Sequence, residues 1–113
     1  MRTFVGSWRA ILRESDYGAG CPVVAASLGG DCTRGARAAA GVAFARWEEL
    51  LAEGIARRGV APDRARSVAT LTIAAIEGAV IVARAQRSAD PLDRVAGELE
   101  LVVADAIALR SGR

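Results

Sequence analysis

The sequence contains no histidine, no lysine and no asparagine, and all 15 of its basic residues are arginine. The lack of histidine excludes a Ser-His-Asp triad, a Cys-His dyad and a metal held by histidine ligands. The lack of lysine excludes a Schiff base and the phosphate-binding lysine of a P-loop. We therefore expect a protein that is not an enzyme and that has no cofactor and no metal site.

Aromatic residues are also scarce, at 4% of the chain. That is too few for a platform on which nucleic-acid bases could stack. The arginines are spread along the chain among 13 acidic residues, whereas nucleic-acid-binding domains cluster their basic residues on one face. We therefore expect no direct contact between these residues and DNA or RNA.

Only two cysteines occur, Cys21 and Cys32, and they do not form a CxxC pair. Two thiols alone cannot build a zinc site. No signal peptide is visible, so we expect a cytoplasmic protein with reduced thiols that act as small packing residues. An alternative is a redox sensor, in which the start of a nearby helix lowers the pKa of Cys21.

The residues that are present predict a single all-α domain over 1–113, with 52% hydrophobic residues and 25 alanines. Glycine clusters and the three prolines (Pro22, Pro62 and Pro91) separate the apolar periodic runs, and proline is tolerated in the first turn of a helix. No run alternates as a β-strand does. We expect five helices, over residues 3–14, 22–28, 34–58, 62–86 and 91–109.

The helix expected over 62–86 is apolar on nearly every side. Its only charge between Arg66 and Arg84 is Glu77. A membrane span needs about 20 clean apolar residues, and this run is shorter and carries a central carboxylate. We therefore expect no membrane span but a helix that is buried on more than one side.

A chain of this length cannot enclose such a helix alone. Because residues 88–90 form a short connection, the last two helices should be antiparallel neighbours. Two copies of this hairpin would form an intermolecular four-helix bundle in a homodimer. The alternative is that a further segment of the same chain covers the apolar face. The expected interface residues are Leu71, Ala75, Gly78 and Val82 from the first helix, and Leu99, Val102, Val103 and Ala106 from the second.

All five aromatic residues lie before residue 48, and the last two helices contain none. A binding pocket needs apolar walls and a few polar groups. The candidate ligand-binding residues are Trp8, Leu12, Tyr17, Phe44, Trp47 and Glu77. The alternative is that these rings are ordinary core.

Glu77 has several possible roles, because a carboxylate among apolar residues must be paired, hydrogen-bonded, neutralised or exposed. It could cap the helix that begins at Pro22. It could instead pair with Arg84 or with an arginine of a partner chain. The third possibility is contact with a ligand, including a cationic one.

Several segments in this order resemble the C-terminal domain of TetR-family transcriptional repressors of the LmrA/YxaF-like subgroup. They are Ser7-Trp8, Tyr17-Gly18-Ala19-Gly20-Cys21-Pro22-Val23, Phe44-Ala45-Arg46-Trp47, Ala75-Ile76-Glu77-Gly78-Ala79 and Ala83-Arg84-Ala85. The resemblance covers about residues 4–109. It implies a domain that senses a small lipophilic effector and dimerises through its last two helices.

In that family a separate N-terminal helix-turn-helix domain binds operator DNA, and effector binding releases it. No helix-turn-helix is visible in this sequence, so we expect operator DNA to be bound only through such a domain elsewhere in a longer protein. The alternative is a standalone all-helical dimerisation module without a ligand.

Overall fold

The computed structural model describes residues 2–28 and 34–111, and these residues form helices with no strand among them. The helices are α1 (Arg2–Glu14), α2 (Pro22–Ser27), α3 (Arg34–Arg57), α4 (Pro62–Gln86) and α5 (Asp90–Ser111). The expectation of an all-α fold with five helices is confirmed, and each expected boundary lies within two residues of the observed one.

The helix ends follow from the residues that were expected to interrupt the chain. Pro22 and Pro62 lie in the first turns of α2 and α4, where the missing N–H removes no helical hydrogen bond. Gly59 lies two residues after the end of α3 and has a φ of 94°, a conformation that favours glycine. Arg87 ends α4 in the left-handed region, and its backbone N–H donates to the Ala83 and Arg84 carbonyls.

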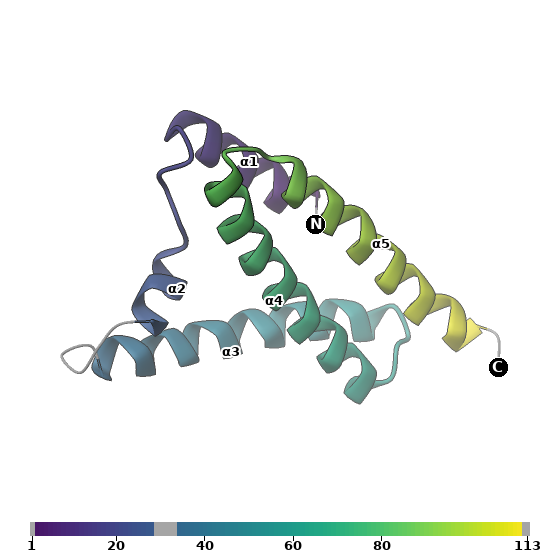
Figure 1. Cartoon of the computed structure of the whole chain (residues 1–113). Coiled ribbons are helices and arrows are strands. Elements are labelled where there is room, and N and C mark those ends of the chain that lie inside the picture. The colour runs from purple at the N-terminus through teal and green to yellow at the C-terminus, as the bar shows by residue number, and fades with distance from the viewer. Residues whose placement is uncertain (1, 29–33, 112–113) are drawn as a thin grey trace.

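Helix α4 is the centre of the fold, and it packs on α3 and on α5 (Figure 1). The larger core cluster joins α1, α4 and α5. Its most deeply buried members are Leu12, Ile76, Val80 and Leu92. A second cluster joins α3, the loop at Val60, α4 and α5, with these residues buried: Ile55, Val60, Ala65, Val68 and Ala106.

The two clusters show that α4 and α5 are antiparallel neighbours, as expected. Ala83 near the end of α4 shares one cluster with Leu92 near the start of α5. Val68 near the start of α4 shares the other with Ala106 near the end of α5. Helix α5 therefore returns along α4 in the opposite direction (Figure 1).

The chain is flat and open for its length. Its radius of gyration is 15.4 Å and its extents are 48 × 32 × 17 Å, whereas a compact chain of this size has a radius of gyration of about 13 Å. Large apolar side chains remain exposed on α4 and α5: Leu71, Ile81, Val82, Leu101 and Leu109. The five helices thus leave apolar surface uncovered.

The residues expected at a dimer interface fall into two groups. On α4, Leu71 and Val82 are exposed, and Ala75 and Gly78 are half-buried. On α5, Leu99 and Ala106 are buried in the clusters that this chain forms by itself, and Val102 and Val103 are half-buried beside the second cluster. The α4 residues therefore lie on an open face, whereas the α5 residues pack largely within the chain.

Within the described residues, α4 is the one helix long and apolar enough to cross a membrane by length and composition, and 44% of that stretch is buried inside the fold. A core helix of a soluble protein passes the same test. Helix α4 carries the buried carboxyl group of Glu77, which is costly inside a membrane and fits the expected helix that is buried on more than one side.

Candidate functional site

A pocket of about 290 Å³ lies between α3 and α4. Its walls are Trp47, Leu50 and Leu51 from α3, and Thr72, Ile73, Ile76 and Glu77 from α4. Ligand pockets in proteins measure about 300–1,000 Å³ and combine apolar walls with a few polar groups. This pocket has that character, at the small end of the range.

The aromatic wall of the pocket is braced by a second ring. Phe44 and Trp47 are three residues apart on α3 and therefore lie on the same side of the helix. Their ring centroids are 5.5 Å apart and the rings are nearly perpendicular, at 85°. This edge-to-face geometry is a favourable one for aromatic pairs, and it restricts the orientation of the Trp47 ring.

Glu77 is the charged residue among those that line the pocket, and it is only 8% exposed. Its Oε2 atom is buried and has no hydrogen-bond partner among the described residues. Burial raises the pKa of the Glu77 carboxyl group, and a hydrogen bond from the Cys21 thiol acts weakly in the opposite direction. A residue that lines the pocket therefore carries a carboxyl oxygen with unused hydrogen-bonding capacity.

The structural roles considered for Glu77 are not seen in residues 2–28 and 34–111. No hydrogen bond joins its carboxyl group to the backbone of α2, and no ion pair joins it to Arg84. The Arg84 guanidinium instead donates from Nη2 to the Gly18 carbonyl at 3.0 Å. Two of the roles that the sequence suggested remain: a pair with an arginine of a partner chain, and contact with a ligand.

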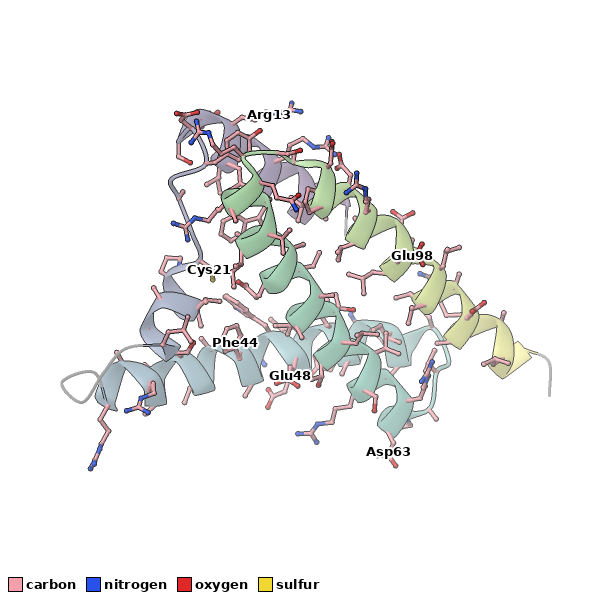
Figure 2. The ribbon with its side chains drawn as sticks, in the orientation of Figure 1. Arg13, Cys21, Phe44, Glu48, Asp63 and Glu98 are labelled. Carbon is pink, nitrogen blue, oxygen red and sulfur yellow. The ribbon has the colours of Figure 1, made fainter. Side chains whose placement is uncertain are left out.

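A second hollow, of about 480 Å³, lies on the α2 side of Glu77. Its lining includes Cys21, Val24, Leu28, Glu77 and Arg84. Figure 2 shows Cys21 between α2 and α4, above the part of α3 that carries Phe44. Glu77 thus stands between two hollows, one beside α3 and one beside α2.

Cys21 is a buried free thiol at the start of α2. Burial raises its pKa, the backbone N–H groups of Val24 and Val23 oppose that effect, and the neighbouring Glu77 carboxyl adds to it. The alternative in which the helix start lowers this pKa is contradicted, because desolvation outweighs the backbone hydrogen bonds at the helix start. A raised pKa does not favour the reactive thiolate that a redox sensor needs. Cys32 lies outside the described residues.

The loop before α2 is held to the end of α4 by two arginines. Besides the Arg84 bond to Gly18, the Arg87 guanidinium pairs with the Asp16 carboxylate, and this pairing lowers the pKa of Asp16. Asp16 and Tyr17 have positive φ values of 53° and 62°. These contacts attach the loop after α1 to the end of α4, the helix that carries one wall of the pocket.

The structure brings together three of the six sequence-predicted ligand residues. Trp47 and Glu77 line the pocket and Phe44 packs on Trp47. Trp8 and Leu12 are buried in the larger core cluster, and half-buried Tyr17 lies beneath the Arg87 guanidinium, whose central carbon is 5.8 Å from the ring centroid. These last three residues are not among those that line the two hollows.

The six ligand-binding residues predicted from the sequence do not include five wall residues: Leu50, Leu51, Thr72, Ile73 and Ile76. Thr72 is a polar group that the sequence offers to a pocket, whereas the four apolar residues were missed. Helical spacing offered a signal for some of them. Leu50 and Leu51 follow Trp47 by three and four residues, and Ile73 precedes Glu77 by four, so each pair shares a helix side. Which sides face each other across the pocket depends on how α3 and α4 cross.

Comparison with known proteins gives a family match over most of the chain. The family described as "Transcriptional regulator LmrA/YxaF-like, C-terminal domain" matches residues 1–98. Two curated Mycobacterium tuberculosis proteins, from strains CDC 1551 / Oshkosh and ATCC 25618 / H37Rv, are named as uncharacterized HTH-type transcriptional regulators. Each is 37% identical over 101 residues, which cover 84% of this chain and 52% of the relative.

The chain therefore spans about half the length of the curated relatives it matches. No solved structure gives a significant match.

Proposed function

Because this chain belongs to the TetR family of transcriptional regulators, as an LmrA/YxaF-like C-terminal domain, we propose that it senses a small apolar or amphipathic molecule. Binding of that molecule would release a repressor from operator DNA. The curated relatives are named HTH-type regulators, and we propose that DNA is contacted through such a helix-turn-helix unit and not through these five helices.

The observation that carries this proposal is the pocket between α3 and α4. Its walls are mainly apolar, its aromatic wall is braced by Phe44, and its lining includes Glu77, one of whose carboxyl oxygens has no partner in the described chain. The Thr72 hydroxyl donates to the Val68 carbonyl at 2.8 Å, so the donor of that group is already used. This combination suits a small molecule with a large apolar part and one polar group.

We propose that the protein acts as a homodimer through the open face of α4. Leu71 is 47% exposed and Val82 is 43% exposed. Gly78 lies between them along α4, and a Cβ atom added there would meet open space. Exposed apolar patches of this kind mark interaction sites. On α5, the exposed Leu101 and Leu109 are better placed for a partner chain than the buried Leu99 and Ala106.

Helix α4 supplies both sites, which gives the proposal a physical route for signalling. Thr72, Ile73, Ile76 and Glu77 face the pocket, and the Leu71–Val82 face lies on the same helix. A ligand that shifts or rotates α4 would therefore alter the contact with the partner chain. If the altered contact changes the affinity for the partner chain, effector binding and dimer geometry are energetically coupled, as an effector-controlled regulator requires.

A binding experiment with N-phenyl-1-naphthylamine, a neutral lipophilic fluorophore, tests the pocket. Replacing Ile73 with Trp fills the pocket, whereas replacing Val42 with Trp adds the same ring at an exposed position on α3. We expect the fluorophore to bind the unmutated chain and Val42→Trp equally, and to lose most of its affinity for Ile73→Trp. Equal binding to both variants would contradict the proposed site, and no binding to any of them would favour a dimerisation module without a ligand.

A further inference from the structure

Glu77 lines the pocket between α3 and α4, and the described chain leaves one of its carboxyl oxygens without a hydrogen bond. Oε2 of Glu77 is buried and unpartnered, in a side chain that is more than nine-tenths buried. Buried polar atoms in proteins are nearly always satisfied, so an exception calls for an explanation. A bound molecule that supplies the missing partner is one such explanation.

The neighbouring side chains do not offer that partner. The Thr72 hydroxyl donates to the Val68 carbonyl and the Arg84 guanidinium donates to the Gly18 carbonyl. The Cys21 thiol approaches the Glu77 carboxyl group from the α2 side, but a thiol is a weak donor and carries no charge. The described residues that line the α3/α4 pocket include no cation.

The rest of the pocket suits a weakly hydrated cation. Trp47 lines the α3 side of the same pocket, across from the α4 wall that carries Glu77, and its ring packs against Phe44. Aromatic rings attract ammonium groups, and tryptophan does so most strongly. Leucine and isoleucine side chains complete the walls. A compact, strongly hydrated cation would lose its bound water there and find no polar groups to replace it. A substituted ammonium is weakly hydrated, so it loses less on entering the pocket.

We propose that the effector of this pocket carries a quaternary or substituted ammonium group, bound between the Glu77 carboxylate and the Trp47 ring. A substituted ammonium that keeps an N–H donates the hydrogen bond that Glu77 lacks, whereas a quaternary ammonium has no N–H and balances the carboxylate by its charge alone. This inference rests on the proposed function and adds the chemical class of the effector. The pocket volume of about 290 Å³ fits such a head group with a short aromatic or aliphatic tail. Arg84, the nearest described cation along α4, lines the hollow on the other side of Glu77 and is absent from the walls of this pocket.

Two compounds of nearly the same shape test the proposal: benzyltrimethylammonium and its neutral analogue neopentylbenzene, in which carbon replaces the charged nitrogen. Affinities are measured by calorimetry on the 113-residue chain at mildly alkaline pH, which favours the ionised carboxyl group. We expect the cation to bind at least about tenfold more tightly than the neutral compound. Glu77→Gln should remove this preference and keep the binding of neopentylbenzene.

The matched control is Glu98→Gln, which removes the same charge from an exposed position on α5 (Figure 2). It should keep the preference for the cation, because a surface charge does not reach the pocket. Retained binding of neopentylbenzene shows that Glu77→Gln is folded. If that variant does not fold, Trp47→Leu takes its place, and it should weaken binding of the cation more than binding of the neutral compound.

The outcomes separate this inference from the proposed function. Equal affinity for the two compounds, or a preference that survives Glu77→Gln, overturns the inference and leaves the pocket as a site for neutral molecules. Failure of both compounds to bind, while N-phenyl-1-naphthylamine binds, overturns the inference alone. Failure of all three compounds overturns the inference and the proposed function together.

Discussion

A side chain added at Gly78 should have opposite effects on folding and on dimer formation. In the chain by itself, no heavy atom outside the helix's own nearby backbone lies within 4 Å of the position that a Cβ atom would take at Gly78. Glycine in a helix interior is less stable than alanine by about 0.5–1 kcal/mol. Gly78→Ala should therefore raise the free energy of unfolding by that amount, which is a rise in Tm of about 2–8 °C for a domain of this size.

The same position should tolerate little in the proposed dimer. Helices that pack closely are about 8–10 Å apart, and a leucine forced into such a contact costs about 1–3 kcal/mol through overpacking. Two-fold symmetry introduces the change twice, so Gly78→Leu should weaken the dimer by about 2–6 kcal/mol. That loss corresponds to a factor of about thirty or more in Kd.

Sedimentation equilibrium over a range of concentrations measures the dimer, and circular dichroism follows unfolding of the same samples. Gly41→Leu is the matched control, because Gly41 is also free of neighbours but lies on α3. We expect Gly41→Leu to remain dimeric and Gly78→Leu to become monomeric with its helices intact. If Gly78→Leu dimerises as well as the control, the open face of α4 is not the interface.

Two further predictions concern buried side chains. The pKa of Glu77 is raised from its ordinary value of 4.5, so the folded state holds the carboxyl proton more tightly than the unfolded state. The protonated carboxyl group therefore contributes to the free energy of unfolding. This contribution is complete below pH 4.5 and is lost as the pH rises through the raised pKa. In urea unfolding, Glu77→Gln should therefore gain stability relative to the unmutated chain as the pH rises from 4.5 towards neutral. A difference in the free energy of unfolding between the two proteins that does not change with pH would contradict this reasoning. Leu12 is fully buried, so Leu12→Ala should cost about 2.5–5 kcal/mol, whereas Ile11→Ala next to it, at a side chain 43% exposed, should cost far less. Similar losses for the two variants would show that Leu12 is not part of the core.

The fold could be predicted closely because the residues that end its helices act locally. Pro22 and Pro62 start helices wherever the rest of the chain lies, since their fixed φ and missing N–H suit a first turn. Glycine at position 59 accepts a positive φ in the same local way. The central place of α4 was also predictable, because an apolar helix must be covered on several sides.

The site was predictable only where one residue stood out from its surroundings. Glu77 is the sole charge in a long apolar run, and its burial is the finding that this contrast suggested. Trp8 and Leu12 carry the same apolar character as Trp47, yet they pack in the core and not on the pocket wall. Residue type indicates that a side chain is buried, but the crossing of α3 and α4 decides whether it borders empty space.

The helix period has a similar limit at the proposed interface. The three- and four-residue steps through Leu99 and Ala106 identify an apolar side of α5. Burial against α4 in the same chain and burial against a partner chain remove similar apolar area from water, so the pattern does not distinguish them. In the structure these residues are buried within the chain. Leu71 and Val82 on α4 remain exposed because Ile76 and Val80 already fill the contacts inside. An apolar helix can serve the core on one side and a partner on the other. In the proposed dimer α4 would do both, because it carries the pocket residue Glu77 and the open face at Gly78.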